Sequence, residues 1–332
     1  MEKLEVASSP HLYRVHRSTR RMMFQVIIAL LPAVAVSLFV FKVHALFQLA
    51  VCVLSCMAFE WLFALIRGRR STLEDNSAIV TGLILALSLP WNAPWYVPFF
   101  GSLIAIGVGK AVYGGLGQNI FNPAMVGRAF VMLSFATVMG GNAYQFQGEA
   151  GEAFSGIVTQ ATPMVQLKTL GASSAEQISA SIPQDTVSVL KMCFAGVHNG
   201  SLGEASGLAI LIGGLYLIIR RNGGWRVTVG MLAAVFIIGC LTSVSNAPIY
   251  HGLLYLTNGA VLFGAFFIAT DPVTNPITPA GRWYFGIGVG ILTMVFRLFS
   301  GYPEGVMFAV LIMNSLSPLL NHVTIPKPFG QD

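Results

Sequence analysis

Long apolar stretches alternate with short polar ones along almost the whole chain. Ten stretches suit transmembrane helices, which need about 20 residues, or fewer where a helix is short or broken. They cover residues 23–42, 46–66, 77–90, 95–112, 122–139, 205–219, 227–243, 255–270, 283–299 and 304–320. The third, eighth and tenth are short or contain Asn, Thr or Pro, which favours discontinuous or re-entrant segments. The pattern therefore predicts an all-α integral membrane protein with about ten transmembrane segments.

Composition agrees with this prediction. Hydrophobic residues make up 55% of the 332 positions and charged residues only 10%, against about 25% charged in a soluble domain. The net charge of +6 comes from basic residues at the ends of apolar runs, so we expect no nucleic-acid partner. The first apolar run is longer than the core of a cleaved signal peptide and is interpreted as a retained span. No set of Cys and His residues completes a metal site, and the four cysteines are expected to be buried thiols.

Basic residues indicate the orientation in the membrane. They follow even numbers of predicted crossings: Arg14, Arg17, Arg20 and Arg21 before the first span, then Arg67, Arg69, Arg70, Lys110, Arg220, Arg221, Arg226, Arg282 and Lys327. Because cytoplasmic loops are enriched in Lys and Arg, both termini are predicted to be cytoplasmic and residues 140–204 to lie outside. Arg297 does not fit this pattern, and we expect it either to reach the membrane surface or to pair with an acid such as Glu304.

The orientation divides the chain into two halves. Residues 1–22 form a cytoplasmic segment, 23–139 a first group of five spans, 140–204 an outside loop, 205–320 a second group of five spans and 321–332 a cytoplasmic tail. The first group begins inside and the second begins outside, which is typical of two inverted repeats. The third segment of each half is broken by polar and proline residues, and such breaks indicate a site where helix ends face a ligand or ion.

Two polar stretches are the candidate ligand or ion sites. "YGGLGQNIFNPAMVGRAF" combines glycines, which allow close approach to a ligand, with a helix start and an arginine inside a span. "IATDPVTNPITPAGR" places an aspartate at the end of an apolar run. The candidate residues are Gly114, Gly115, Asn119, Asn122, Arg128 and Asp271. The alternative for each stretch is a turn between spans. Asp75, Asn76 and Ser77 similarly predict either a helix cap or a cytoplasmic entrance for an ion or cofactor.

Motifs for soluble redox chemistry are not found. The sequence has no glycine-rich nucleotide-binding motif, no catalytic triad and no cysteine-rich ferredoxin motif. The catalytic residues therefore stay unknown, and we do not expect the chain to bind NAD itself.

Six stretches, in order along the chain, resemble one family. "ASSPH", "DNSAIVTGLILALSLP", "YGGLGQNIFNPAM", "QATPM", "GAFFIATDPVT" and "GYPEGVMFAVLIMN" are similar to the RnfD subunits of ion-translocating Rnf electron-transport complexes and their NqrB relatives. The resemblance implies a flavin-carrying subunit of a bacterial inner-membrane complex that couples ferredoxin and NAD exchange to sodium or proton movement. The implied partners are the other Rnf subunits, a flavin transferase and membrane lipid. The chain is not expected to be active alone.

The resemblance also implies a covalent flavin site in the outside loop. Family members carry FMN joined through its phosphate to a threonine, and the matching residues here are Thr159, Gln160, Ala161, Thr162 and Pro163. Thr162 is the implied attachment residue and Thr159 the competing hydroxyl. The transferase acts outside the cytoplasm, which agrees with a periplasmic loop. Gly156 stands where the family motif often has aspartate. A noncovalent riboflavin near the broken segments is a further implication.

Two other functions remain open from the residues themselves. The inverted repeat with broken segments also predicts a small-solute or ion transporter or channel with no redox role. A structural assembly subunit would carry no chromophore. A flavin on Thr162 distinguishes the redox subunit from both alternatives.

Overall fold

The computed structural model describes residues 19–68, 73–139, 201–220, 224–242, 248–257, 260–300 and 305–325. Their secondary structure is helical apart from one isolated antiparallel bridge between Pro90 and Ser201. This confirms the all-α prediction for these residues. Thr159 to Pro163, Gly156, Cys193 and Glu304 lie outside the described residues, and so does the rest of the predicted outside loop up to residue 200.

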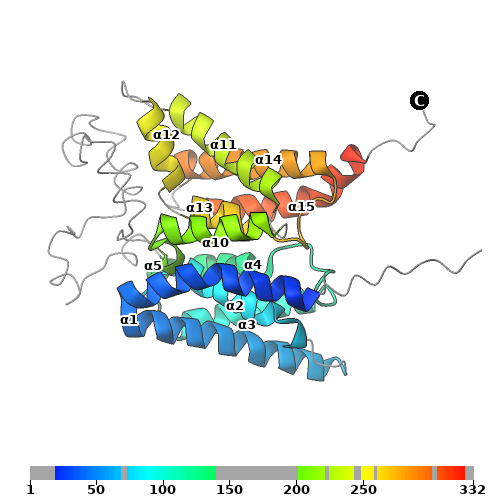
Figure 1. Cartoon of the computed structure of the whole chain (residues 1–332). Helices are drawn as coiled ribbons and strands as arrows, with labels where there is room; N and C mark the ends of the chain where they lie inside the picture. Colours follow the sequence, from blue (N-terminus) through cyan, green and yellow to red (C-terminus); the bar gives the residue numbers. More distant parts are fainter. Residues whose placement is uncertain are drawn as a thin grey trace, which may run out of the picture.

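The helices lie roughly side by side in one bundle (Figure 1). In chain order they are α1 Thr19–Ile66, η1 Leu73–Asp75, α2 Ser77–Ser88, α3 Tyr96–Ile106, η2 Gly107–Ala111, α4 Pro123–Ser134, α5 Ala136–Met139, η4 Leu202–Glu204, α10 Gly207–Ile219, α11 Trp225–Leu241, α12 Pro248–Thr257, α13 Val261–Phe263, η5 Gly264–Ile268, α14 Pro279–Phe299 and α15 Val306–Thr324. η2 and η5 are π-helical turns that extend α3 and α13.

Three described helices are long and apolar enough to cross a membrane: α1, α14 and α15. The bent pair His251–Thr257 and Val261–Ile268, with 64° between its two parts, would be a fourth. α1 contains 48 residues, and Lys42 interrupts it with φ 48° and ψ −123°. The predicted spans 23–42 and 46–66 left residues 43–45 as a connection. In the structure these residues are helical, and the break is at Lys42. The described part has further apolar helices of 10–17 residues, which include α2, α4, α10 and α11.

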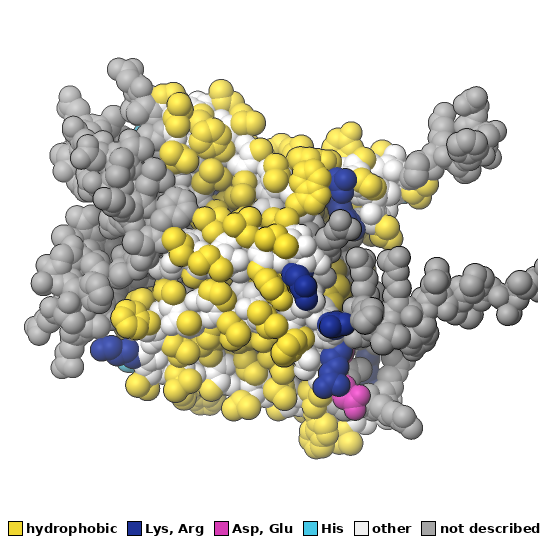
Figure 2. Space-filling model, viewed as in Figure 1, with side chains coloured by type: hydrophobic (Ala, Val, Ile, Leu, Met, Phe, Trp, Pro, Cys, Tyr) yellow, Lys and Arg dark blue, Asp and Glu magenta, His cyan; other side chains and the backbone are white. Residues whose placement is uncertain are grey.

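The surface of the bundle has the character expected in lipid. Large apolar side chains are exposed along the helices, among them Phe39, Leu54, Ile219 and Phe299, and Figure 2 shows them spread over the visible face. Most visible Lys and Arg side chains gather at the end of the bundle where α1 begins and α15 ends (Figures 1 and 2). Because a soluble monomer rarely exposes so large an apolar surface, this surface supports a membrane protein.

Close packing between helices depends on small residues. α11 packs along α14, α14 along α15, and α3 along α4. At Gly286 in α14, an added Cβ would overlap the backbone carbonyl oxygen of Val227 in α11. Without a hydrophobic driving force between helices in lipid, such close backbone contact is a main source of association.

The predicted buried state of the cysteines is confirmed at two positions. Cys52 and Cys56 are fully buried in α1, whereas Cys240 in α11 is partly exposed. Cys240 lies on the helix side that the bundle covers less, so the prediction was wrong for this residue.

Gly286→Ala tests the α11–α14 contact. We expect a lower thermal midpoint in detergent, with a cost of roughly 1–3 kcal/mol from overpacking against backbone. Gly230→Ala, in the facing helix α11, is the matched control, because its nearest neighbour would be the Ile287 backbone nitrogen at 3.3 Å. Equal midpoints for the two variants would contradict the packing described.

Candidate functional site

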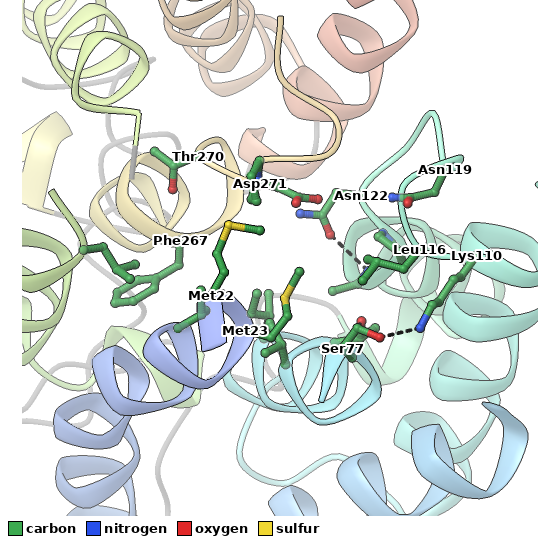
Figure 3. A pocket seen from close by; sticks show the side chains of 18 residues that line it. Met22, Met23, Ser77, Lys110, Leu116, Asn119, Asn122, Phe267, Thr270 and Asp271 are labelled. Atoms are coloured by element: carbon green, nitrogen blue, oxygen red, sulfur yellow. Dashed lines mark hydrogen bonds between the residues drawn. The ribbon is translucent and has the colours of Figure 1, made fainter. Parts of the chain in front are cut away.

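A pocket lined by apolar side chains and several polar ones lies at the end of the bundle where the basic side chains gather (Figure 2). It is formed where several helices begin or end: the starts of α1, α2 and α4, and the ends of η2, α10 and η5. Its lining includes Met22, Met23, Ser77, Thr81, Lys110, Leu116, Asn119, Asn122, Phe267, Thr270 and Asp271. Figure 3 shows these side chains converging from segments far apart in the sequence.

Asn122 joins the two halves of the chain at this pocket. Its Oδ1 accepts hydrogen bonds from the backbone N–H groups of Ala124 (3.1 Å) and Met125 (3.5 Å) and so caps α4. Its Nδ2 donates to the carbonyl oxygen of Ile268 at the end of η5 (3.4 Å). Pro123 follows at the first helical position, where its missing N–H has no consequence. The start of α4 is therefore fixed against the end of η5.

Asn119 organises the loop before α4. Its Oδ1 accepts from the Gly117 N–H (3.3 Å) and its Nδ2 donates to the Phe121 carbonyl oxygen (3.1 Å). Gly114 and Gly115 have φ values of 118° and 120°, a conformation that favours glycine. They shape the turn that brings Asn119 and Leu116 to the pocket, but they do not line it themselves.

Asp271 lies in the turn that joins η5 to α14 and lines the opposite side of the pocket. Its carboxylate accepts from the Val273 N–H (3.2 Å) and the Thr274 hydroxyl (3.4 Å). Burial raises the pKa of Asp271 to about 6, and these two hydrogen bonds oppose the shift. Asp271 thus both caps its own turn and faces the cavity, the two roles that the sequence suggested.

A buried ion pair lies where α1, α2 and η2 meet, beside the pocket. Lys110 Nζ lies 2.6 Å from Glu60 Oε1, and both side chains are about 5% exposed or less. Lys110 Nζ also donates to Ser77 Oγ (2.5 Å), which in turn donates to Asp75 Oδ1 (2.5 Å). From the sequence, Lys110 was interpreted only as an indicator of the cytoplasmic side, and Glu60 was not identified as a candidate residue. The available signal was one acid and one base inside apolar runs, since intramembrane charges are usually functional or paired.

The predicted helix cap at the start of α2 is confirmed for Asp75 but not for Asn76. Asn76 stands at the N-cap with φ 62° and makes no side-chain capping bond. Asp75 Oδ1 instead accepts from the Ser77 N–H (2.8 Å). The acid therefore satisfies the free N–H group, and Ser77 is left with its hydroxyl oriented toward Lys110.

Arg128 belongs to a second polar cluster away from the pocket. Arg128 in α4 and Arg297 in α14 are each 1% exposed and interact electrostatically with buried Glu204 in η4. Arg297 Nη1 donates to the Tyr255 carbonyl oxygen (2.7 Å), and the Ser201 hydroxyl donates to Glu204 (2.7 Å). Arg297 is 1% exposed, so the prediction that it reaches the membrane surface is wrong; Glu204 is an acid that interacts with it electrostatically, and the predicted partner Glu304 lies outside the described residues. The arginine lies inside the bundle, where its guanidinium contacts the last turn of α12.

The pocket suits an amphiphilic, planar organic ligand better than a metal ion. In the described ranges no three His, Cys, Asp or Glu residues are grouped as metal ligands. Asn119 and Asn122 provide amides, Ser77 and Thr81 hydroxyls, and Met22, Met23 and Phe267 an apolar wall. The present cavity of about 60 Å³ holds only a few water molecules.

These features define an all-helical membrane protein with a pocket of mixed apolar and polar lining at the ends of several helices. Comparison with known proteins places it more closely: the profile of the NQR2, RnfD, RnfE family matches residues 5–330. The chain belongs to this family.

Individual relatives are similar along their whole length. The D subunit of the Na(+)-translocating ferredoxin:NAD(+) oxidoreductase complex of Acetobacterium woodii is 41% identical over 98% of this chain and 95% of its own. The D subunit of the proton-translocating ferredoxin:NAD(+) oxidoreductase complex of Clostridium ljungdahlii is 37% identical over 98% and 96%. The D subunit of the ion-translocating oxidoreductase complex of Stutzerimonas stutzeri is 38% identical over 96% and 94%.

The Lys110–Glu60 pair predicts a strong coupling in stability. Lys110→Met and Glu60→Gln each leave one buried charge without its partner, and we expect each to cost about 3–5 kcal/mol. The double variant removes both charges and should lose much less than the sum of the single variants. Thermal midpoints of the four proteins in detergent measure this cycle. Additive losses would show that the two residues do not interact.

Proposed function

We propose that this chain is the flavin-carrying membrane subunit of a complex that couples electron transfer between ferredoxin and NAD to ion translocation. The observation that carries the proposal is the full-length similarity to the D subunits of complexes whose names state this coupling. The chain contributes a scaffold and flavin sites, and partner subunits contribute the reactions with ferredoxin and NAD. The working location is a bacterial inner membrane.

The proposed topology has ten spans in two inverted five-span repeats, with both termini in the cytoplasm. Equivalent pairs pack in the two halves: α1 with α3 and α11 with α14, then α3 with α4 and α14 with α15. The third segment is α2 in the first half and the bent α12–α13 pair in the second. α2 has 12 residues and is about 18 Å long at 1.5 Å per residue. It is shorter than a bilayer core of about 30 Å, as expected for a re-entrant segment.

The predicted outside loop begins and ends at the end of the bundle opposite the pocket. Met139 at the end of α5 precedes this loop, and Ser201 and η4 form its last, described part directly before α10. Ser201 pairs with Pro90, and Ser37 in α1, close to the Lys42 break, donates to the Leu202 carbonyl oxygen (2.6 Å). Since the pocket end carries the arginines, the opposite end is the proposed periplasmic side.

Thr162 in this loop is the proposed attachment residue for FMN, on the resemblance of "QATPM" to the family motif. When bound, a flavin accepts two electrons and releases them singly. Thr162 contributes the hydroxyl oxygen of the phosphoester, and Thr159, Gln160, Ala161 and Pro163 would form the segment that the transferase recognises. A flavin transferase in the host is therefore required.

A second, noncovalent flavin, riboflavin, is proposed for the pocket. Asn119, Asn122 and Asp271 line the pocket together, whereas Gly114, Gly115 and Arg128 do not. We therefore assign the first three to direct contact and the glycines to loop shape, and we place Arg128 outside this site. Asn122 Nδ2 has a second N–H that can donate a hydrogen bond to a carbonyl oxygen of the flavin ring. Met22 and Met23 would cover one face of the ring and exclude water from it. The transporter and assembly alternatives need no flavin at either place.

Thr162→Ala tests the covalent flavin. The denatured wild-type chain, made in a host with the transferase, should fluoresce in a gel under ultraviolet light, and the variant should be dark. Thr159→Ala is the matched control and should stay fluorescent. A dark wild-type band would contradict the redox proposal and favour a transporter or assembly subunit, whereas fluorescence lost only in Thr159→Ala would move the attachment residue.

Leu116→Trp tests the pocket flavin. Leu116 points into the cavity (Figure 3), and the larger ring should compete with riboflavin for space. We expect riboflavin affinity to fall at least about tenfold, roughly 1.4 kcal/mol. Ile120→Trp is the control, since Ile120 lies in the same loop, is 43% exposed and does not line the pocket. Equal riboflavin affinities for both variants would contradict the assignment.

A further inference from the structure

Lys110 is a buried cation at the edge of the proposed riboflavin pocket. Its helix turn, η2, is a π-helix, and its side chain extends between α1 and α2 (Figure 3). It is 3% exposed, and it lines the cavity together with Ser77. An ammonium group has three N–H donors. Glu60 and Ser77 accept two of them, and the third remains for a group in the cavity.

Lys110 is contacted by groups of α1 and α2, and the carboxylate of Asp271 lines the opposite side of the cavity. Glu60 in α1 supplies the buried carboxylate at 2.6 Å, and Ser77 is neutral. Asp75 touches Ser77 from the partly exposed start of α2, where water weakens its effect. Charges separated by a few ångströms in an apolar interior interact far more strongly than in water. A change of charge in the cavity would therefore interact with Lys110 directly and with Glu60 at a greater distance.

We infer that Lys110 sets the reduction potential of the flavin in this pocket, and that Glu60 is the positioning residue that moderates its effect. The inference rests on the proposed second flavin. A bound flavin would accept two electrons from a partner redox group of the complex and one proton from water, and its reduced form would carry one negative charge at the pyrimidine edge. Charged groups near a flavin ring tune its electronic properties. The Lys110 ammonium stabilises the reduced form, and the Glu60 carboxylate opposes that stabilisation; neither residue transfers a proton in this step.

The assignment predicts shifts of opposite sign for two neutralising substitutions. Lys110→Gln removes the cation and should lower the potential, changing the equilibrium between oxidised and reduced flavin at least about tenfold, or about 30 mV for a two-electron couple. Glu60→Gln keeps a hydrogen-bond acceptor for Lys110 but removes the negative charge, so it should raise the potential. The double variant should lie between the two single variants. A purely structural role would not give this order.

The experiment uses the full chain carrying Thr162→Ala, so that only the pocket flavin is titrated. Each variant is purified in detergent with riboflavin, its retention is measured by fluorescence, and its potential is read from the visible absorbance during a reductive titration. Arg220→Gln is the control, because Arg220 is exposed at the same end of the bundle and does not line the pocket. Its potential should match that of the parent.

The role of Lys110 and the presence of riboflavin in the pocket are tested separately. If the parent protein retains no riboflavin, both the second flavin and the role of Lys110 are wrong. If riboflavin is retained but the two single variants shift its potential in the same direction, or do not shift it, the pocket flavin stands and the role of Lys110 is overturned. If the single variants unfold, the double variant decides: Lys110 lines the cavity and Glu60 is farther from it, so removal of both charges should still lower the potential below that of the parent, and an unchanged potential would overturn the role of Lys110.

Discussion

Backbone groups freed by a broken helix must be covered by protein wherever lipid surrounds the chain, and the pocket end of this bundle depends on that constraint. Side chains cap three helix starts at this end. Asn122 accepts from the first N–H groups of α4, Thr278 from Gly281 in α14 and Asp75 from Ser77 in α2. At α4 the capping residue also binds the end of η5. The helix breaks therefore connect the two halves of the bundle, and a cavity with several polar side chains lies between them.

Charged side chains that are buried in the bundle also need partners, and they have them at two places. Lys110 and Glu60 balance each other beside the pocket, and Glu204 lies near Arg128 and Arg297 elsewhere in the bundle. Removing one member of such a group lowers stability because the remaining charge is buried without a partner of opposite charge. On the proposed topology the pocket is cytoplasmic and the FMN loop is periplasmic. One chain would then hold flavins near both surfaces, which is a suitable arrangement for an electron carrier in an ion-translocating complex.

Much of the helical pattern could be predicted from hydrophobicity alone. The predicted segments 77–90, 205–219 and 227–243 correspond closely to α2, α10 and α11, since each is a continuous apolar run with polar ends. The start of α4 was readable from Asn122 and Pro123. The pairing of Lys110 with Glu60 was not readable, because the two residues are 50 positions apart and only the packing of η2 against α1 brings them together. Met22 and Met23 were missed as pocket residues because nothing local distinguishes them from other apolar side chains at a helix start.

The central claim is that this one chain carries two flavins held in different ways. The most direct measurement is a flavin inventory of the full-length protein, made in a host with the flavin transferase and precipitated with acid. The account predicts one flavin per chain that stays with the precipitated protein, as FMN, and one that is released to the supernatant, as riboflavin. A protein without flavin in either fraction would contradict the account and leave a membrane scaffold or transporter.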